Sequence, residues 1–121
     1  MNFKIDTKEK MHVITLEEAK LAGNMTAELQ SFLLSFLDKE VKNLVIKMDT
    51  IQVIDVEIAK ELASVQQLYY EKNQSLVYCG FQKGVEQFLE ELELLEIMNI
   101  TPTESEAWDI VQMEEIEREF L

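Results

Sequence analysis

Short apolar stretches alternate with polar breaks along this chain, and the first two stretches predict paired strands. Residues 1–6 alternate between apolar and polar side chains, and Met11–Leu16 is rich in Val, Ile and Thr. Both patterns are typical of strands. The charged segment Lys8–Lys10 separates the two stretches. We therefore predict a β-hairpin at the start of the chain.

Three later segments place apolar side chains three and four residues apart, which is the spacing of one helix face. Gly23 and Asn24 precede the first segment, and Asp55 precedes the second, where its carboxylate can cap the first free backbone amides. The second helix should end near Lys72. Helix by helix, the apolar positions are Met25, Leu29, Phe32, Leu33, Phe36 and Leu37; Ile58, Leu62, Val65, Leu68 and Tyr69; and Val85, Phe88, Leu89 and Leu92.

Two short apolar runs predict strands in the middle of a sheet. Asn43–Met48 ends at Asp49, and Ser75–Cys79 is closed by Gly80. Continuous apolar runs of this length are typical of strands that are buried on both faces. Because helices that connect parallel strands must cover the sheet, these two strands should be neighbours. We expect Thr50–Asp55 to form a loop.

The predicted order of elements is two strands, helix, strand, helix, strand, helix, a weak strand over Ile97–Thr101, and a final helix. This order predicts an α/β fold with a mixed β-sheet of about four to five strands covered by about four helices. A chain of 121 residues suits one compact domain. We expect that single domain to span residues 1–121, with a C-terminal helix over about 104–121.

The final helix carries two apolar stripes. Pro102 ends the weak strand, and the segment from Thr103 to Glu106 has the spacing of a capping box. The second stripe either folds back onto the core or forms an exposed interface for a partner or a second copy. The first stripe, which should pack on the domain, comprises Ala107, Trp108 and Val111, and the second comprises Ile110, Met113, Ile116 and Phe120.

Charge narrows the classes of partner. The formal net charge is −13, which would repel nucleic-acid phosphates and acidic lipid surfaces. Residues 73–121 hold 12 acidic and only 2 basic side chains. This excess of negative charge either forms a solvated surface or steers a basic partner toward the protein. No apolar run approaches the roughly 18 residues of a membrane helix, and the start lacks a signal-peptide pattern. We expect a cytoplasmic protein that binds neither nucleic acid nor membrane.

The residues that most often carry chemistry are isolated in this chain. His12 has no nucleophile or carboxylate at catalytic spacing, and Cys79 has no second thiol and no basic neighbour. The segment Gly80–Gly84 lacks both the dinucleotide and the Walker patterns and is interpreted as a turn. We predict no enzyme, no cofactor and no metal site. The glutamates that lack the spacing of a calcium loop are Glu90, Glu91, Glu93 and Glu96.

The segment Asn43–Asp55 and the helix after it resemble the signature of the STAS domain family, which includes bacterial anti-sigma factor antagonists. Asp49 and Asp55 fall where that signature has its two Asp residues. The resemblance implies the STAS fold for essentially the whole chain. The tail Met113–Glu119 is similar to that of STAS proteins from Bacteroidetes, which suggests that source. The later landmarks that match in order are Leu76–Cys79, Val85, Phe88, Leu92–Leu94 and Thr103–Ala107.

The chain departs from the family at the start of that helix. Antagonists place a phosphorylatable Ser directly after the second Asp, whereas this chain has Val56, followed by Glu57. In the family, a kinase that is also the anti-sigma factor phosphorylates this Ser and is thereby released. The resemblance therefore implies the docking surface without the switch. Glu57 either imitates a phosphate or stabilises the helix dipole, by about 0.3–1 kcal/mol. Glu93 replaces a Gly that is common in the family, which questions a tight turn.

We predict a non-enzymatic protein-interaction module that resembles an anti-sigma factor antagonist and acts in transcriptional or stress regulation. The expected partner is an anti-sigma factor or another kinase-like regulatory protein. The alternative is a non-switching scaffold subunit that assembles with another STAS protein, and a homodimer is also possible. The residues expected to bind the partner are Asp55, Val56, Glu57, Ile58, Ala59 and Lys60.

Overall fold

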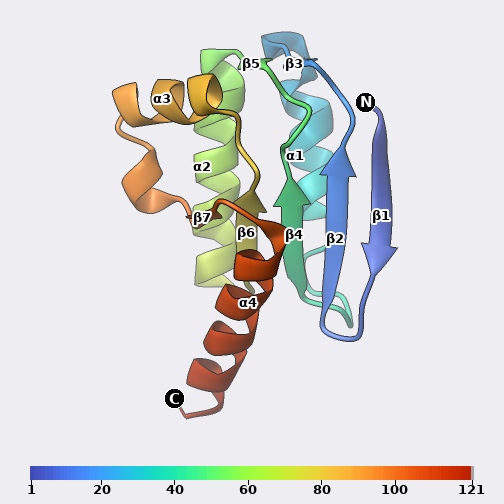
Figure 1. Cartoon of the computed structure of the whole chain (residues 1–121). Helices are drawn as coiled ribbons and strands as arrows, with labels where there is room; N and C mark the ends of the chain where they lie inside the picture. The colour runs from blue at the N-terminus through green and yellow to red at the C-terminus, as the bar shows by residue number, and fades with distance from the viewer. Residues whose placement is uncertain (121) are drawn as a thin grey trace.

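The computed structural model describes residues 1–120. The expected end of the last helix at residue 121 lies outside these residues. Figure 1 shows the elements in chain order. They are β1 (Phe3–Thr7), β2 (Met11–Leu16), β3 (Lys20–Leu21), the 3-10 helix η1 (Gly23–Met25), α1 (Thr26–Leu34), β4 (Asn43–Lys47), β5 (Val53–Ile54), α2 (Val56–Glu71), β6 (Leu76–Cys79), α3 (Lys83–Glu91), the 3-10 helix η2 (Leu95–Ile97), β7 (Ile100–Thr101) and α4 (Glu104–Glu119).

The main sheet has five strands in the order β1-β2-β4-β6-β7. β1 and β2 form the predicted antiparallel hairpin, and the other neighbours are parallel. The prediction that the two apolar runs form adjacent central strands is confirmed, because Val45 in β4 lies opposite Val77 in β6. Both strands are shielded from water because crossover helices cover a parallel sheet.

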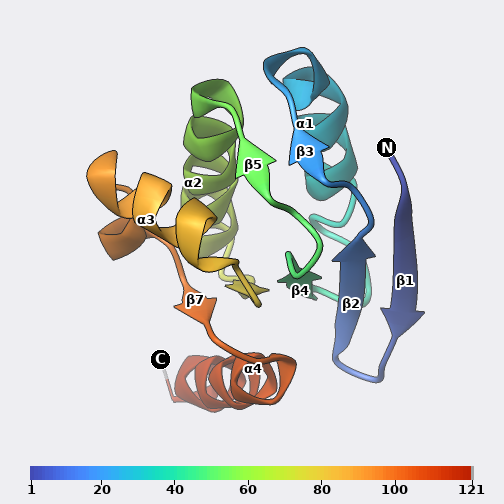
Figure 2. The same cartoon turned by 45° about the horizontal axis from the view of Figure 1, so that its top comes forward.

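Successive strand residues point to opposite faces of the sheet, so β4 and β6 supply side chains to two cores. Ile46 and Tyr78 face the larger core, which α1, α2 and α3 cover. Val45 and Val77 face the smaller core, which α4 covers. Figure 2 shows α4 on the opposite side of the sheet from α1, α2 and α3. The expected mixed α/β architecture is confirmed.

The segment predicted to be a loop between β4 and α2 contains a short strand. β5 pairs in parallel with β3 in a second sheet of two strands, outside the main sheet. Each strand of this pair has only two residues, which is too short to produce a hydrophobic period. Their pairing fixes the entry of α2, because the Asp55 N–H donates to the Leu21 carbonyl at 3.0 Å.

α4 begins at the predicted cap. The Thr103 hydroxyl oxygen accepts a hydrogen bond from the Glu106 N–H at 3.2 Å. Its first stripe packs on the sheet, with Ala107 and Val111 fully buried. The second stripe is divided, because Ile110 packs against the smaller core while three of its members remain exposed. The exposed members are Met113, Ile116 and Phe120.

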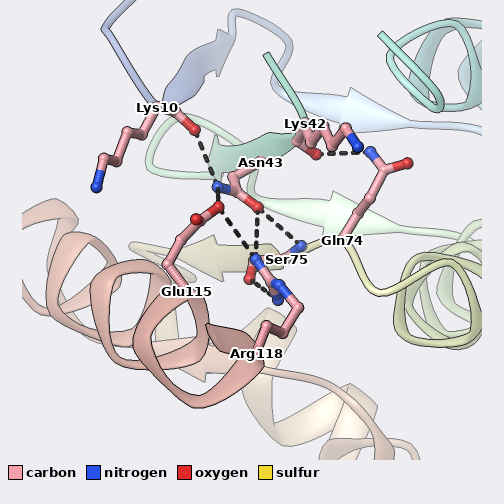
Figure 3. Close-up of polar contacts among 7 residues, drawn as sticks. All are labelled: Lys10, Lys42, Asn43, Gln74, Ser75, Glu115 and Arg118. Carbon is pink, nitrogen blue, oxygen red and sulfur yellow. Dashed lines mark hydrogen bonds and ion pairs between the residues drawn. The ribbon is translucent and has the colours of Figure 1, made fainter. Parts of the chain in front are cut away.

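A polar cluster anchors the C-terminal half of α4 to the ends of β4 and β6 (Figure 3). The Arg118 guanidinium donates to the Ser75 hydroxyl at 3.0 Å and to the Asn43 side-chain carbonyl at 3.2 Å. Asn43 also donates to Glu115 and to the Lys10 carbonyl. The buried Asn43 amide therefore uses both its donor and its acceptor. This cluster holds the second half of α4 on the sheet, and the buried side chains of Ala107 and Val111 hold its first half.

No helix within residues 1–120 has the combination of length and apolar character that a membrane crossing needs.

Candidate functional site

The entry of α2 lies at one end of the molecule, beside η1 and the β3–β5 pair (Figure 2). Backbone hydrogen bonds hold the two chain segments together, with Gln52 N–H donating to the Ala19 carbonyl at 2.8 Å and Asp55 N–H to Leu21. The Thr50 hydroxyl adds a bond to the Leu16 carbonyl at 2.8 Å. The start of α2 is therefore a rigid feature, positioned by contacts between residues distant in sequence.

The Asp55 carboxylate does not make the predicted cap. Asp55 is the N-cap residue of α2 and has the expected extended backbone, but its side chain forms no capping hydrogen bond. Its Oδ2 accepts from the Gly23 N–H at 2.7 Å, and its Oδ1 lies 3.9 Å from the Lys20 Nζ. The carboxylate turns toward η1 because the Gly23 amide offers it a donor there. Asp55 thus joins the entry of α2 to η1.

Gly23 lets η1 approach the first turn of α2 closely. A Cβ atom on residue 23 would lie 3.0 Å from Glu57 Oε2 and 3.6 Å from Asp55 Oδ2. Two carboxylates therefore flank this glycine. Both also lie near the positive end of the α2 dipole, where negative charge is stabilised.

The six residues predicted to bind a partner do not share one environment. Ile58 and Ala59 are fully buried in the larger core, so their side chains offer nothing to a partner. They form the inward face of the first turns of α2, and the prediction that the six residues bind a partner stays a prediction. Val56 is 36% exposed. Glu57 and Lys60 are also exposed.

Val53 joins this exposed set, although it is not among the residues predicted to bind a partner. Its side chain is 50% exposed, whereas its neighbour Ile54 is buried. Alternation between an outward and an inward apolar residue was the available signal, but it spans only the two residues of β5. We call the exposed residues Val53, Val56, Glu57 and Lys60 the α2 entry surface. It combines two apolar side chains with one negative and one positive charge.

The two Asp residues of the recognised segment have different surroundings. Asp49 follows β4 and lies against Gly80, which has a φ of +75°, and a Cβ atom there would come within 2.0 Å of Asp49 Oδ1. The Gln82 side chain donates to the Asp49 carbonyl at 2.9 Å. Asp49 therefore packs against the β6–α3 connection, while Asp55 contacts η1.

The tight turn that the replacement of a family glycine by Glu93 put in doubt is present. Glu93 adopts a φ of +60°, the left-handed conformation that glycine adopts most easily. The Leu94 N–H donates to the Leu89 carbonyl at 3.0 Å and closes the chain reversal after α3. The fold thus keeps the tight turn without a glycine.

His12 and Cys79 lie apart from the α2 entry surface. His12 Nδ1 lies 2.8 Å from the Thr7 hydroxyl, and its ring lies 5.0 Å from the ring of Phe36. Burial lowers its pKa. Cys79 is buried in the smaller core, and that burial raises the pKa of its thiol to about 12. A thiol with this pKa stays protonated near neutral pH, so Cys79 acts as a small packing residue.

Over the described part of the chain, no group of three or more His, Cys, Asp or Glu residues could hold a metal ion.

The family model of the STAS domain matches residues 2–107. This range includes the α2 entry surface and ends in the early part of α4. No curated protein matches the chain significantly in sequence.

Solved structures match over nearly the whole chain. An anti-sigma-factor antagonist (STAS) domain protein from Planctomyces limnophilus has 13% identity and a TM-score of 0.77, covering 91% of this chain and 97% of that one. A Ser-to-Glu variant of RsbS from Moorella thermoacetica has 20% identity and a TM-score of 0.75, covering 93% and 96%. A chain of the stressosome, described as a signal integration and transduction hub, has 19% identity and a TM-score of 0.69, covering 90% and 96%. At these identities the likeness establishes the fold.

Proposed function

The chain belongs to the STAS domain family, and from this premise we propose that it is a non-enzymatic interaction module that binds a regulatory protein through its α2 entry surface. The proposed partner is an anti-sigma factor or another kinase-like regulator, and the proposed role is in transcriptional or stress regulation. The observation that carries the proposal is the exposed apolar side chain of Val56, held on a rigid helix entry beside opposite charges.

The chemistry of the surface supports binding to a protein. Val53 and Val56 supply apolar area that gains free energy when a partner removes it from water. Glu57 and Lys60 flank them and can select a partner with complementary charges. Because η1 and the β3–β5 pair hold this entry in place, little conformational entropy is lost on binding.

We propose that this surface works without a phosphorylation switch. Val56 stands where the family signature has its phosphorylatable Ser, and a valine has no hydroxyl to accept phosphate. Glu57 is one position further along and carries one charge, whereas a phosphoserine carries nearly two. We assign Glu57 to stabilising the α2 dipole. Binding would then be regulated by the abundance or state of the partner.

A second candidate function is a scaffold subunit that assembles with another STAS protein. The match to a stressosome chain supports it, because that solved assembly contains a chain with this fold. In that role the absence of the Ser is harmless, since no switching is required of the subunit. The same α2 entry surface would contact the neighbouring STAS domain.

Photo-crosslinking in the cells of origin tests the proposal and separates the two candidates. A photoreactive phenylalanine analogue replaces Val56 in one variant and Ser105 in a control, because Ser105 is exposed on α4 across the sheet. We expect an adduct from residue 56 and none from residue 105. Mass spectrometry of the adduct then identifies either a kinase-like regulator or a second STAS protein. Equal adducts from both positions, or none from residue 56, would contradict the proposal.

A further inference from the structure

β1 is the edge strand of the main sheet, and one row of its backbone groups is available to a partner (Figure 1). The Lys8 N–H donates to the Met11 carbonyl, and the Glu17 N–H donates to the Asn2 carbonyl, both at 2.8 Å. Even-numbered residues therefore bond to β2. In an antiparallel ladder, the alternate residues turn their N–H and C=O groups the other way. Phe3, Ile5 and Thr7 thus direct theirs to the outer edge.

This edge also exposes apolar side chains. Phe3 is 40% exposed and Ile5 is 44% exposed. The Phe3 ring lies 4.4 Å from that of Phe32 in α1, which in turn lies 5.4 Å from Phe36, so the apolar strip continues onto the helix. Natural proteins usually protect an edge strand with charges, proline or a bulge. β1 contains no proline, and its two charges, Lys4 and Asp6, have opposite signs, so a second antiparallel copy can pair them instead of being repelled.

We propose that two copies of the chain pair through this edge, antiparallel and centred on Ile5, so that their sheets join across a two-fold axis. In this register Ile5 faces Ile5 of the other copy, and Phe3 faces Thr7. Each facing odd-numbered pair exchanges two backbone hydrogen bonds. The even-numbered residues form the closer pairs between these, and Lys4 of each copy lies opposite Asp6 of the other.

The charge pattern selects this register. Odd-numbered residues must face one another, because they carry the free backbone groups. Shifting the axis to Lys4 or to Asp6 keeps that pairing but places two identical charges opposite each other, which is destabilising. Of the registers centred on Lys4, Ile5 and Asp6, only the one centred on Ile5 pairs unlike charges on both sides of the axis, and it also keeps the pairing within β1.

The occupant of the edge is a second copy because the edge is complementary to itself. The hairpin over residues 1–16 carries three basic and two acidic side chains, so the strongly negative charge of the chain is not concentrated there. The exposed stripe of α4 is a poorer self-contact, because α4 carries seven acidic side chains and its one arginine is bonded to the domain. Pairing through β1 also joins two α2 entry surfaces in one particle, which raises avidity for a multivalent partner.

The first test is a proline at the axis. Ile5→Pro removes an outward N–H and leaves the β2 ladder intact, and proline is tolerated at such a position of an edge strand. Sedimentation analysis of the full chain should find a dimer for the wild type and at least a tenfold increase in the dimer dissociation constant for the variant. Circular dichroism should show both proteins folded. A wild type that is monomeric at all concentrations, or a variant that dimerises equally well, would overturn the proposal.

Charge reversal and cross-linking test the register itself. Lys4→Asp should weaken the dimer, and adding Asp6→Lys should restore it, because the pair is complementary again with its signs exchanged. Ile5→Cys should form a disulfide between copies, since facing residues of a hydrogen-bonded pair have Cα atoms about 5.5 Å apart. Lys4→Cys should not, because residue 4 faces residue 6. Failure of the double variant to recover, or cross-linking through residue 4 instead of residue 5, contradicts this register.

Discussion

The Asp55 carboxylate accepts a hydrogen bond from the Gly23 N–H at 2.7 Å, across 32 positions of sequence. This bond connects the residue before α2 to η1, at the point where both chain segments leave the β3–β5 pair. Asp55 therefore has a structural role at the α2 entry surface, separate from any contact with a partner. Removal of the Asp55 carboxylate should first destabilise the α2 entry surface, and an effect on partner binding should follow from that loss.

Asp55→Ala should lower the free energy of unfolding by about 1–2 kcal/mol, because the part-buried Gly23 amide loses a charged acceptor. Chemical denaturation measures this loss. Lys60→Gln is the matched control, since Lys60 is exposed in the second turn of α2 and its replacement should change stability by less than about 0.5 kcal/mol. Equal stability of Asp55→Ala and the wild type would show that the bond contributes nothing.

Arg118→Ala should destabilise the fold by about 1–2 kcal/mol, because the Ser75 hydroxyl and the Asn43 carbonyl lose a charged donor. Met113→Gln, on the exposed side of the same helix, should leave the melting temperature nearly unchanged. Thermal unfolding of the two variants makes the comparison. A larger loss for Met113→Gln than for Arg118→Ala would mean that α4 packs on the sheet through its other face.

The pKa of His12 in the folded protein should lie below its ordinary value of 6.5, because burial disfavours the charged ring. The unfolded chain then binds a proton more readily than the folded one. The contribution of His12 to the stability of the fold is therefore full above pH 6.5, the ordinary pKa of histidine. It is lost as the pH falls toward the lower pKa that His12 has in the folded protein. It is the only histidine of the chain, so NMR can follow its ring directly. A His12→Gln variant should lack this part of the pH dependence, and a folded pKa above 6.5 would contradict the assignment.

A serine kinase that acts on related antagonists should not phosphorylate the start of α2, because our alignment to the family signature places Val56, which has no hydroxyl, at the acceptor position. Thr50 and Ser64 are the only hydroxyl residues between 50 and 64, and the Thr50 hydroxyl already donates to the Leu16 carbonyl. Intact-mass measurement after incubation with ATP decides this. Val56→Ser is the matched variant and should gain one phosphate. Phosphate mapped to residues 50–64 of the wild type would show that the alignment to the family signature is out of register.

Elements with a clear hydrophobic period could be predicted from the sequence. Val45 and Val77 belong to uninterrupted apolar runs, and such runs indicate central strands without knowledge of their partners. β3 and β5 could not be found in this way, because a pair of two-residue strands is defined only by its pairing. The position of the candidate site was therefore accessible from sequence, whereas its local architecture was not.

Side-chain roles that depend on distant residues were beyond the sequence. The local sequence predicts that the Asp55 carboxylate caps α2. In the structure it accepts instead from the amide of Gly23 in η1, which is distant in sequence. The bond between Arg118 and Asn43 joins residues 75 positions apart, and no local sequence pattern around either residue predicts it. The burial of Ile58 and Ala59, by contrast, follows from the sequence, since the helical period that predicts α2 also turns these two residues inward.

We propose that the regulatory partner binds the exposed apolar side chain of Val56 in the α2 entry surface, and the dissociation constant of a Val56→Arg variant measures this contribution. The partner is the protein captured by cross-linking, and Tyr70→Arg is the control because Tyr70 is exposed near the other end of α2. We predict at least tenfold weaker binding for Val56→Arg, equivalent to about 1.4 kcal/mol, and no change for Tyr70→Arg. Equal affinity of wild type and Val56→Arg, with both folded, would show that the partner does not bind at the α2 entry surface.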